Sequence, residues 1–306
     1  MTVGKKLRND SAFGGYNRTA MAKHIVCLTF DFDGISGWIA RGQTTPSPVS
    51  RGEFGPRVGA PRLLKLLAQH DIASSWYVPG HTIETFPDAV RAVVDAGHEI
   101  GHHGWRHIPP ASLSREEEEA ELVRGNEAIR RISGEYARGY RSPSWDLSPH
   151  SIELMLKHGF TYDTSMMGDD YTPYFARQGD VIELEKPARF GKPSALVEMP
   201  ISWSTDDAPH FEFTRTGTAV RQGLMNANKV LENWVGDFLH MKGTVKWGVL
   251  TFTCHPFIIG RGHRILMLER LIRRLRAEGA VFQRMDATVE EFRSRAAAAA
   301  RRSRMA

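Results

Sequence analysis

The chain has 306 residues, 41% hydrophobic and 25% charged, which is close to the average of soluble globular proteins. This composition excludes a fibrous or largely disordered protein, and no run approaches the roughly 18 apolar residues of a transmembrane helix. Two cysteines are too few for a disulfide framework. The net charge of +5 allows nucleic-acid binding, but the arginines are scattered and no recognised nucleic-acid motif accompanies them. We therefore expect neither a membrane nor a nucleic acid as partner.

Residues 1–22 are rich in glycine, serine, asparagine and charge, so we predict a flexible N-terminal arm. This end is basic, but it lacks the apolar run of about 7–15 residues that a secretory signal requires. If this start is complete, the expected location is the cytoplasm. Residues 23–295 contain no linker and are predicted to form one domain, and residues 296–306 are predicted to be a frayed helical tail.

Strand-like apolar runs alternate with segments of helical periodicity along the chain. In chain order we predict a strand at 24–32, a helix at 61–70, a strand at about 72–78, a helix at 87–96, a strand at about 98–103, a helix at about 115–132 behind a capping box of Ser114 and Glu117, a strand near 137–142, a helix at about 150–158, strands near 160–164 and 196–200, a helical stretch near 217–241, a strand at 247–255 and a last helix that stops near Gly279. This alternation indicates a parallel sheet, and roughly six to eight such units favour a barrel over an open sheet. The predicted fold class is α/β, a single-domain barrel.

Residues 34–60 are predicted to be an unusually long loop, and loops of this length in compact domains are often functional. Trp38, Arg41 and Arg51 are candidates for contacts with a substrate or a partner, although a packed surface loop explains them equally well. Trp145 and Trp203 are either walls of a pocket or core aromatics.

Two carboxylates end the first predicted strand. Asp31 and Asp33 are two residues apart, so the alternation of a strand places both on one face. In a barrel, active sites form at this end of the strands. Two close carboxylates repel each other unless a cation or an arginine compensates. The alternative is a pair of solvated turn aspartates, because Asp-Gly is also a common turn signal.

Four histidines lie in the segment 98–107. His98 and His102 have the spacing of the zinc-peptidase motif, which works only on a helix. The segment follows a helix stop and looks like a strand, on which residues four apart are separated by roughly 13 Å. We therefore reject the peptidase interpretation.

His103 and His107 are also four apart, where the strand gives way to a turn at Gly104. A single helical turn there would let both imidazoles reach one ion. Asp33 would complete a set of two histidines and one carboxylate, which leaves positions open for water and substrate. One or two structural histidines are the alternative.

Two further segments end predicted strands. Arg141, in Arg-Ser-Pro, could keep Asp31 ionised and fix its orientation, although a surface arginine before a proline turn is the simpler interpretation. His255 ends the strand 247–255, where it could donate a proton to a leaving amine or simply be a polar strand end.

Together, in this order, these four segments resemble the polysaccharide deacetylase family (carbohydrate esterase family four, the NodB-homology domain) over roughly residues 24–290. The family motif TFDDG is similar to TFDFDG here, with Phe32 inserted between the carboxylates. That insertion, and the stretches TTPSPVSRGEFG, YDTSMMGDDYTPY and WSTDDAPHF, resemble a cytoplasmic branch with peptidoglycan deacetylase-like proteins, cyclic imide hydrolases and metal-free allantoinases.

The resemblance implies a distorted (β/α) barrel that binds a divalent metal, usually zinc. It implies the following roles: Asp31 as base, Asp33, His103 and His107 as metal ligands, Arg141 as the residue that holds Asp31, and His255 as proton donor. Candidate substrate contacts are Trp38, Arg51, Pro143, Trp145 and Trp203.

The expected activity is metal-dependent hydrolysis of a non-peptide carbon–nitrogen bond, in a small cytosolic cyclic imide, ureide or related amide. The alternative is N-deacetylation of an N-acetylated sugar of the peptidoglycan or chitin type. A different class of function is a non-catalytic carbohydrate-binding barrel. The presence of all six implied site residues argues against it. A homo-oligomer is expected.

Overall fold

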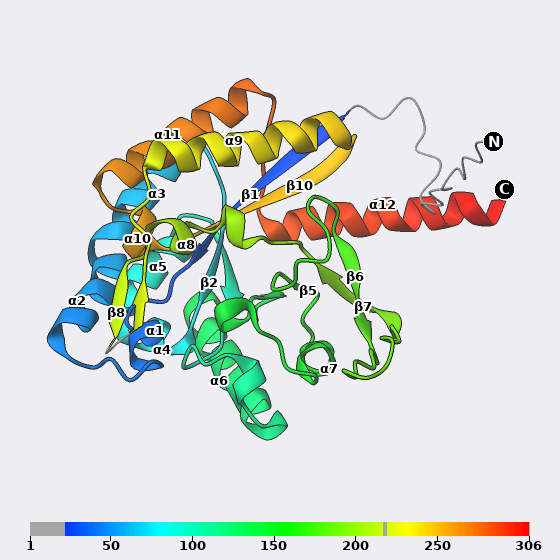
Figure 1. Ribbon diagram of the computed structural model, residues 1–306, viewed down its shortest axis with the longest axis horizontal. Coiled ribbons are helices and arrows are strands. Elements are labelled where there is room, and N and C mark those ends of the chain that lie inside the picture. Colours follow the sequence, from blue (N-terminus) through cyan, green and yellow to red (C-terminus); the bar gives the residue numbers. More distant parts are fainter. Residues whose placement is uncertain (1–21, 217–218, 306) are drawn as a thin grey trace, which may run out of the picture.

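A computed structural model describes residues 22–216 and 219–305 (Figure 1). The N-terminal arm predicted for 1–22 lies, apart from Ala22, outside the described residues. Among those described, nine strands form one sheet, whose main path runs in the order β10-β1-β2-β3-β4-β5-β7-β6, with β11 also paired to β1. The strands are β1 (Lys23–Asp31), β2 (Ser75–Val78), β3 (Glu99–His102), β4 (Gly139–Tyr140), β5 (Tyr162–Asp163), β6 (Tyr174–Gln178), β7 (Lys192–Glu198), β10 (Trp247–Cys254) and β11 (Val281–Phe282).

Helices wrap this sheet (Figure 1). They are α1 (Ser36–Ile39), α2 (Pro46–Phe54), the π-helix η1 (Gly55–Gly59), α3 (Ala60–Gln69), α4 (Gly80–Thr85), α5 (Pro87–Asp95), η2 (Pro110–Ser112), α6 (Arg115–Ser133), η3 (Pro143–Trp145), α7 (Ser151–Lys157), η4 (Trp203–Thr205), α8 (Asp207–Phe211), α9 (Ala227–Thr244), α10 (Pro256–Ile259), α11 (Gly262–Ala277) and α12 (Met285–Met305). A separate two-stranded antiparallel sheet pairs β8 (Thr214–Thr216) with β9 (Ala219–Arg221). The fold is a single-domain, distorted (β/α) barrel, as predicted.

The sheet is parallel throughout except for β6, which pairs with β7 in the antiparallel sense. Side chains of a strand alternate between its two faces, and both faces of β1 are buried. Ile25 and Cys27 belong to the small cluster that α12 covers, whereas Val26 and Leu28 pack in the large cluster formed with the other helices. Burial on both faces explains why β1 is a continuous apolar run.

Most predicted elements are present, but two segments differ. The predicted long loop 34–60 is largely helical, because α1, α2 and η1 occupy it. The predicted helix near 217–241 begins only at Ala227, where the side chain of Asn226 caps it by accepting a bond from Asn228 N–H, and β9 precedes it. The capping box of α6 is confirmed. The predicted tail boundary at residue 295 falls inside α12.

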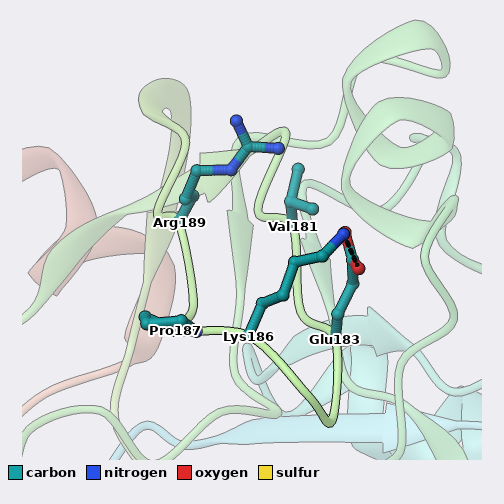
Figure 2. Close-up of a pocket in the computed structure, with 5 residues that line it drawn as sticks. All are labelled: Val181, Glu183, Lys186, Pro187 and Arg189. Atoms are coloured by element: carbon teal, nitrogen blue, oxygen red, sulfur yellow. Dashed lines mark ion pairs between the residues drawn. The ribbon is translucent and has the colours of Figure 1, made fainter.

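The described part of the chain contains no helix that is both long and apolar enough to cross a membrane. A small hollow in the loop between β6 and β7 is lined by Val181, Glu183, Lys186, Pro187 and Arg189 (Figure 2). An ion pair of 2.6 Å joins Glu183 to Lys186 across it. Its lining comes from this one loop and includes none of the predicted site residues.

A buried carboxyl, Glu99, ties the start of β3 to α12. It accepts hydrogen bonds from the Ser75 hydroxyl (2.5 Å), the Tyr162 hydroxyl (2.6 Å) and the Asp286 backbone N–H (3.2 Å). Burial, with a smaller contribution from Asp286, raises the pKa of Glu99 to about 7. The folded protein therefore holds this proton more tightly than the unfolded chain does.

We expect Glu99→Gln to weaken the pH dependence of stability. Because the pKa of Glu99 rises on folding from 4.5 to about 7, the free energy of unfolding falls as pH rises through that interval and is flat above it. Glutamine is neutral at every pH, so the free energy of unfolding of the variant lacks this decrease with rising pH. Urea unfolding at about pH 5 and about pH 8, with chelator present, measures the difference. Exposed Glu135→Gln is the control, and equal slopes for wild type and Glu99→Gln contradict the prediction.

Candidate active site

The carboxyl ends of four parallel strands bring the predicted catalytic residues to one rim. Asp31 ends β1, His103 follows β3, Arg141 follows β4 and His255 follows β10. The β1–β10 register pairs Phe30 with Cys254, so residues more than two hundred positions apart in sequence become neighbours. This is the end of the sheet at which active sites of parallel α/β folds form.

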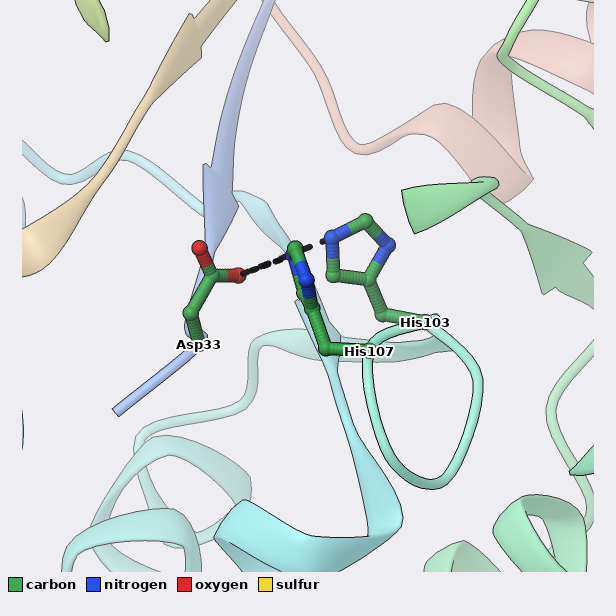
Figure 3. Close-up of side chains that lie close together, drawn as sticks. All are labelled: Asp33, His103 and His107. Atoms are coloured by element: carbon green, nitrogen blue, oxygen red, sulfur yellow. Dashed lines mark ion pairs between the residues drawn. The ribbon is translucent and has the colours of Figure 1, made fainter. Parts of the chain in front are cut away.

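Asp33, His103 and His107 come together at this rim (Figure 3). The Oδ1 atom of Asp33 lies 3.5 Å from His103 Nε2 and 3.4 Å from His107 Nε2. These distances match the spacing of roughly 3.3–3.4 Å between two ligands of a tetrahedral ion with bonds of about 2.0–2.1 Å. The donor set and its spacing therefore fit a divalent cation.

Two further observations support this fit. Asp33 Oδ1 is buried and accepts no hydrogen bond from any described residue, which is costly unless a cation satisfies it. The Nδ1 atom of His103 lies 2.8 Å from the backbone carbonyl of Arg141, which fixes the tautomer with the proton on Nδ1 and leaves Nε2 as a ligand. Burial lowers the pKa of His103 to about 4, so this imidazole is neutral near pH 7 and can ligate.

The loop that carries His107 is not the single helical turn that the sequence predicted. The backbone bends through left-handed conformations at Gly104 (φ 69°) and His107 (φ 61°). The buried carboxylate of Glu121, on α6, holds the bend by accepting bonds from the backbone N–H groups of Trp105 (2.9 Å) and Arg106 (2.7 Å). The sequence analysis missed Glu121, because its partners, two backbone N–H groups and the Arg106 side chain, lie at least 15 residues away in the sequence.

Arg141 and Asp31 form a buried ion pair of 2.7 Å beside the three candidate ligands. Arg141 is fully buried, and it also donates to the Thr29 hydroxyl at 2.8 Å. The pair occupies Asp31 Oδ1, while Oδ2 lies 3.9 Å from His103 Nε2, on the side of the candidate metal centre. Arg141 thus fixes the orientation of a carboxylate that faces the centre.

His255 is held by two acids that the sequence analysis did not single out. Its Nδ1 lies 2.7 Å from Asp207 and 3.6 Å from Asp206, and its Nε2 points toward the centre, 3.9 Å from Asp33 Oδ2. Burial favours the neutral imidazole, but Asp207 and Asp206 prevail and raise the pKa of His255 well above its ordinary value. The two acids therefore favour the protonated form of His255. The sequence signal that could have identified these two acids is the Asp-Asp pair in the stretch WSTDDAPHF.

The other two histidines of the segment face away from the centre. His98 Nδ1 accepts a bond of 3.1 Å from Ser74 N–H, and His102 Nε2 lies 3.1 Å from the Leu122 carbonyl. His102 lies in β3, and His98 directly precedes it, so the strand interpretation is confirmed. The zinc-peptidase motif requires a helix, and this segment is not helical.

The predicted substrate contacts have different surroundings. Trp145 is buried and stacks on half-exposed Trp203, with ring centroids 4.0 Å apart, and Pro143 is buried beside them. Trp38 is buried, and Arg51 is bound to Glu212 at 2.7 Å and to the Phe213 carbonyl at 2.8 Å. Of these two tryptophans, Trp203 is exposed to solvent, and buried Trp145 supports it from beneath.

The chain is similar to known proteins over nearly its whole length. The sequence profile of the family described as Polysaccharide deacetylase matches residues 19–162. A peptidoglycan deacetylase of Helicobacter pylori is 35% identical over 289 residues, which cover 90% of this chain and 98% of that protein. The peptidoglycan deacetylase-like protein FGM2 of Gibberella zeae is 31% identical over 278 residues, covering 83% of this chain and 81% of that protein.

Solved structures agree with this relationship. A Mycobacterium smegmatis protein described as a candidate polysaccharide deacetylase superposes with a TM-score of 0.81 at 29% identity, covering 92% of this chain and 93% of that chain. A Puue allantoinase superposes with a TM-score of 0.74 at 21% identity, covering 95% and 98%, and at that identity it supports the fold alone. The chain belongs to the polysaccharide deacetylase family and is a hydrolase of carbon–nitrogen bonds other than peptide bonds.

Proposed function

We propose that this hydrolase is metal-dependent and cleaves the amide-type bond of a small cytosolic molecule, a cyclic imide or a ureide. The observation that carries the proposal is the orphaned Asp33 Oδ1, which faces two imidazole nitrogens within 3.5 Å. Two imidazoles and one carboxylate are a ligand set that suits zinc. The five side chains around the centre are only 2–12% exposed, which favours a small substrate over a long polymer.

The proposed mechanism assigns each proton to a residue. Asp33, His103 and His107 would hold a divalent ion, which would supply a Lewis acid that acidifies water and polarises a carbonyl. Asp31, oriented by Arg141, accepts the proton of the attacking water through Oδ2. The water oxygen bonds to the carbonyl carbon, and the carbon–nitrogen bond then breaks. Protonated His255 donates its Nε2 proton to the departing nitrogen, and Asp207 stabilises the imidazolium until then.

N-deacetylation of an N-acetylated sugar is the second candidate, and a specific observation favours it. The Helicobacter pylori relative, named as a peptidoglycan deacetylase, is matched over 98% of its own length. An acetamide is also an amide, so the same base, acid and ligand set serve both reactions. The half-exposed face of Trp203, stacked on Trp145, is a surface on which a sugar ring could lie.

Removal of the metal tests the proposal. We expect dialysis against a chelator to abolish hydrolysis, and one equivalent of zinc to restore it, because the Lewis acid contributes several kcal/mol to the reaction. Elemental analysis before and after dialysis measures the occupancy. Undiminished turnover by protein shown to be metal-free contradicts the proposal.

A substrate panel separates the two candidates. Ammonia release or ring opening is measured with succinimide and hydantoin, and acetate release with N-acetylated chitooligosaccharides and peptidoglycan fragments. We expect ring opening to be the faster reaction. Activity confined to the acetylated sugars would replace the imide or ureide by the sugar and leave the metal mechanism unchanged.

A further inference from the structure

The loop between β6 and β7 carries apolar side chains into solvent. Leu184 is 98% exposed and Ile182 is 68% exposed. Leu184 stands between Glu183 and Glu185, and residues 180–185 contain three acids and no base. We call residues 180–185 the hairpin tip. Apolar side chains that are exposed together and bordered by charge mark surfaces that bind another molecule.

The rest of the loop holds the hairpin tip in a fixed shape (Figure 2). Backbone hydrogen bonds of 2.8 and 3.0 Å join Val181 to Arg189 across the loop. The Asp180 carboxylate accepts a bond of 2.7 Å from Gly191 N–H and forms an ion pair of 3.0 Å with Arg177. Because the tip is already ordered, its docking on a partner would cost little conformational entropy.

A groove of about 640 Å³ runs between α9 and α11, which lie against each other. We call it the α9–α11 groove. Its floor is apolar, because it is lined by side chains four residues apart on one face of α9, and its wall on α11 is basic. The floor consists of Leu231, Val235 and Leu239, and the wall of Arg270, Arg273 and Arg274.

Gly236 also lines the groove, and packing within the chain does not explain it. It lies near the middle of α9, where a glycine lowers the stability of a helix. A Cβ at this position would meet no described atom within 4 Å beyond the backbone of its own helix turn. A larger side chain would therefore fit the isolated chain, but it would narrow the groove for a partner.

The hairpin tip and the groove have complementary charges. Lys186 pairs with Glu183 at 2.6 Å, but within the described part of the chain Glu185 forms no ion pair. On the groove wall, Arg273 and Arg274 are paired with glutamates of their own helix end, at 2.6 and 3.0 Å. Arg270 is bonded to the neutral side chain of Asn228 at 2.7 Å, so its charge is not compensated.

We propose that the hairpin tip of one copy docks in the α9–α11 groove of a second copy of this chain. Leu184 and Ile182 would lie on the apolar floor, and Glu185 would face Arg270 at the basic wall. The β6–β7 hairpin and the α9–α11 pair lie well apart in one copy, so a chain cannot fill its own groove (Figure 1). The contact joins two unlike surfaces, so copies associate head to tail.

Two variants test the two sides of this contact separately. Leu184→Lys puts a cation where the basic wall repels it, and Gly236→Gln fills the groove with a better helix former. Both positions are exposed, so both variants should fold, and Gly236→Gln should melt at the same or a higher temperature. Sedimentation velocity of the full-length protein measures the assembly, and circular dichroism measures the melting.

Each variant has a matched control. Val123→Lys replaces an apolar residue of α6 that is 44% exposed and belongs to neither surface. Gly243→Gln replaces a second glycine of α9, where a Cβ also meets no described atom within 4 Å and which does not line the groove.

We expect the wild type and both controls to form a discrete oligomer. Leu184→Lys and Gly236→Gln should associate about tenfold more weakly or worse and sediment as smaller species. Mixing these two variants should restore a larger species, because the Gly236→Gln chain supplies an intact tip and the Leu184→Lys chain an intact groove. A monomeric wild type, an oligomer that survives in either variant, or a mixture without association would overturn the proposal.

Discussion

Asp33→Asn is expected to remove the metal and the activity together and to lower the stability of the metal-free protein. Its Oδ1 atom accepts no bond from the described residues and lies 3.4–3.5 Å from two imidazole nitrogens. An amide is a far weaker ligand than a carboxylate, so occupancy should fall to background. Loss of several kcal/mol of Lewis-acid stabilisation lowers turnover about a thousandfold or more. Elemental analysis and initial rates measure both effects.

The stability of this variant is the sharper part of the prediction. Burial pushes the pKa of Asp33 up, but the surrounding imidazoles, His107 first, outweigh it and hold the pKa well below its usual range. The neighbouring imidazoles therefore stabilise the ionised Asp33 in the metal-free protein, and this charge contributes stability at neutral pH. Asparagine removes that charge, so the melting temperature in chelator should fall. His98→Asn is the control, because His98 lies outside the ligand set. Wild-type zinc affinity in Asp33→Asn contradicts the prediction.

The strand ends were predictable because they depend only on local patterns and on one topological rule. Apolar runs that end in Asp31 or His255 identify strands, and alternation with helices makes the sheet parallel. All carboxyl ends of a parallel sheet share one edge, so the rim follows without knowledge of any contact. The parallel pairing of β1 with β10, which places Asp31 and His255 at the same edge, agrees with this rule.

The groups that orient the site could not be predicted in the same way. Asp207 acts on His255 through a contact 48 residues away in sequence, and Glu121 acts on backbone N–H groups that carry no sequence signal. The segment 34–60 was predicted to be a loop because its glycines and prolines lower helix propensity. Packing of α2 and η1 against each other and against α10 outweighs that propensity.

Asp31→Asn, two residues from Asp33, is expected to differ in its metal content: metal retained, turnover lost and stability reduced. Asp31 contributes no ligand to the three-residue set, so zinc content should be unchanged. Loss of the base should lower kcat about 10²–10⁴-fold. Arg141 is fully buried, and Asp31 is its ion-pair partner among the described residues at 2.7 Å. Breaking a buried pair on one side costs about 3–5 kcal/mol, which urea unfolding measures.

A double variant separates the two effects. Asp31→Asn combined with Arg141→Met removes both charges, so much of the lost stability should return, because an apolar replacement of a buried ion pair is often neutral or stabilising. Turnover should not return, because neither methionine nor asparagine can accept the proton of the attacking water. If Asp31→Asn alone keeps turnover within about tenfold of wild type, Asp31 is not the base, and the ion pair with Arg141 is then purely structural.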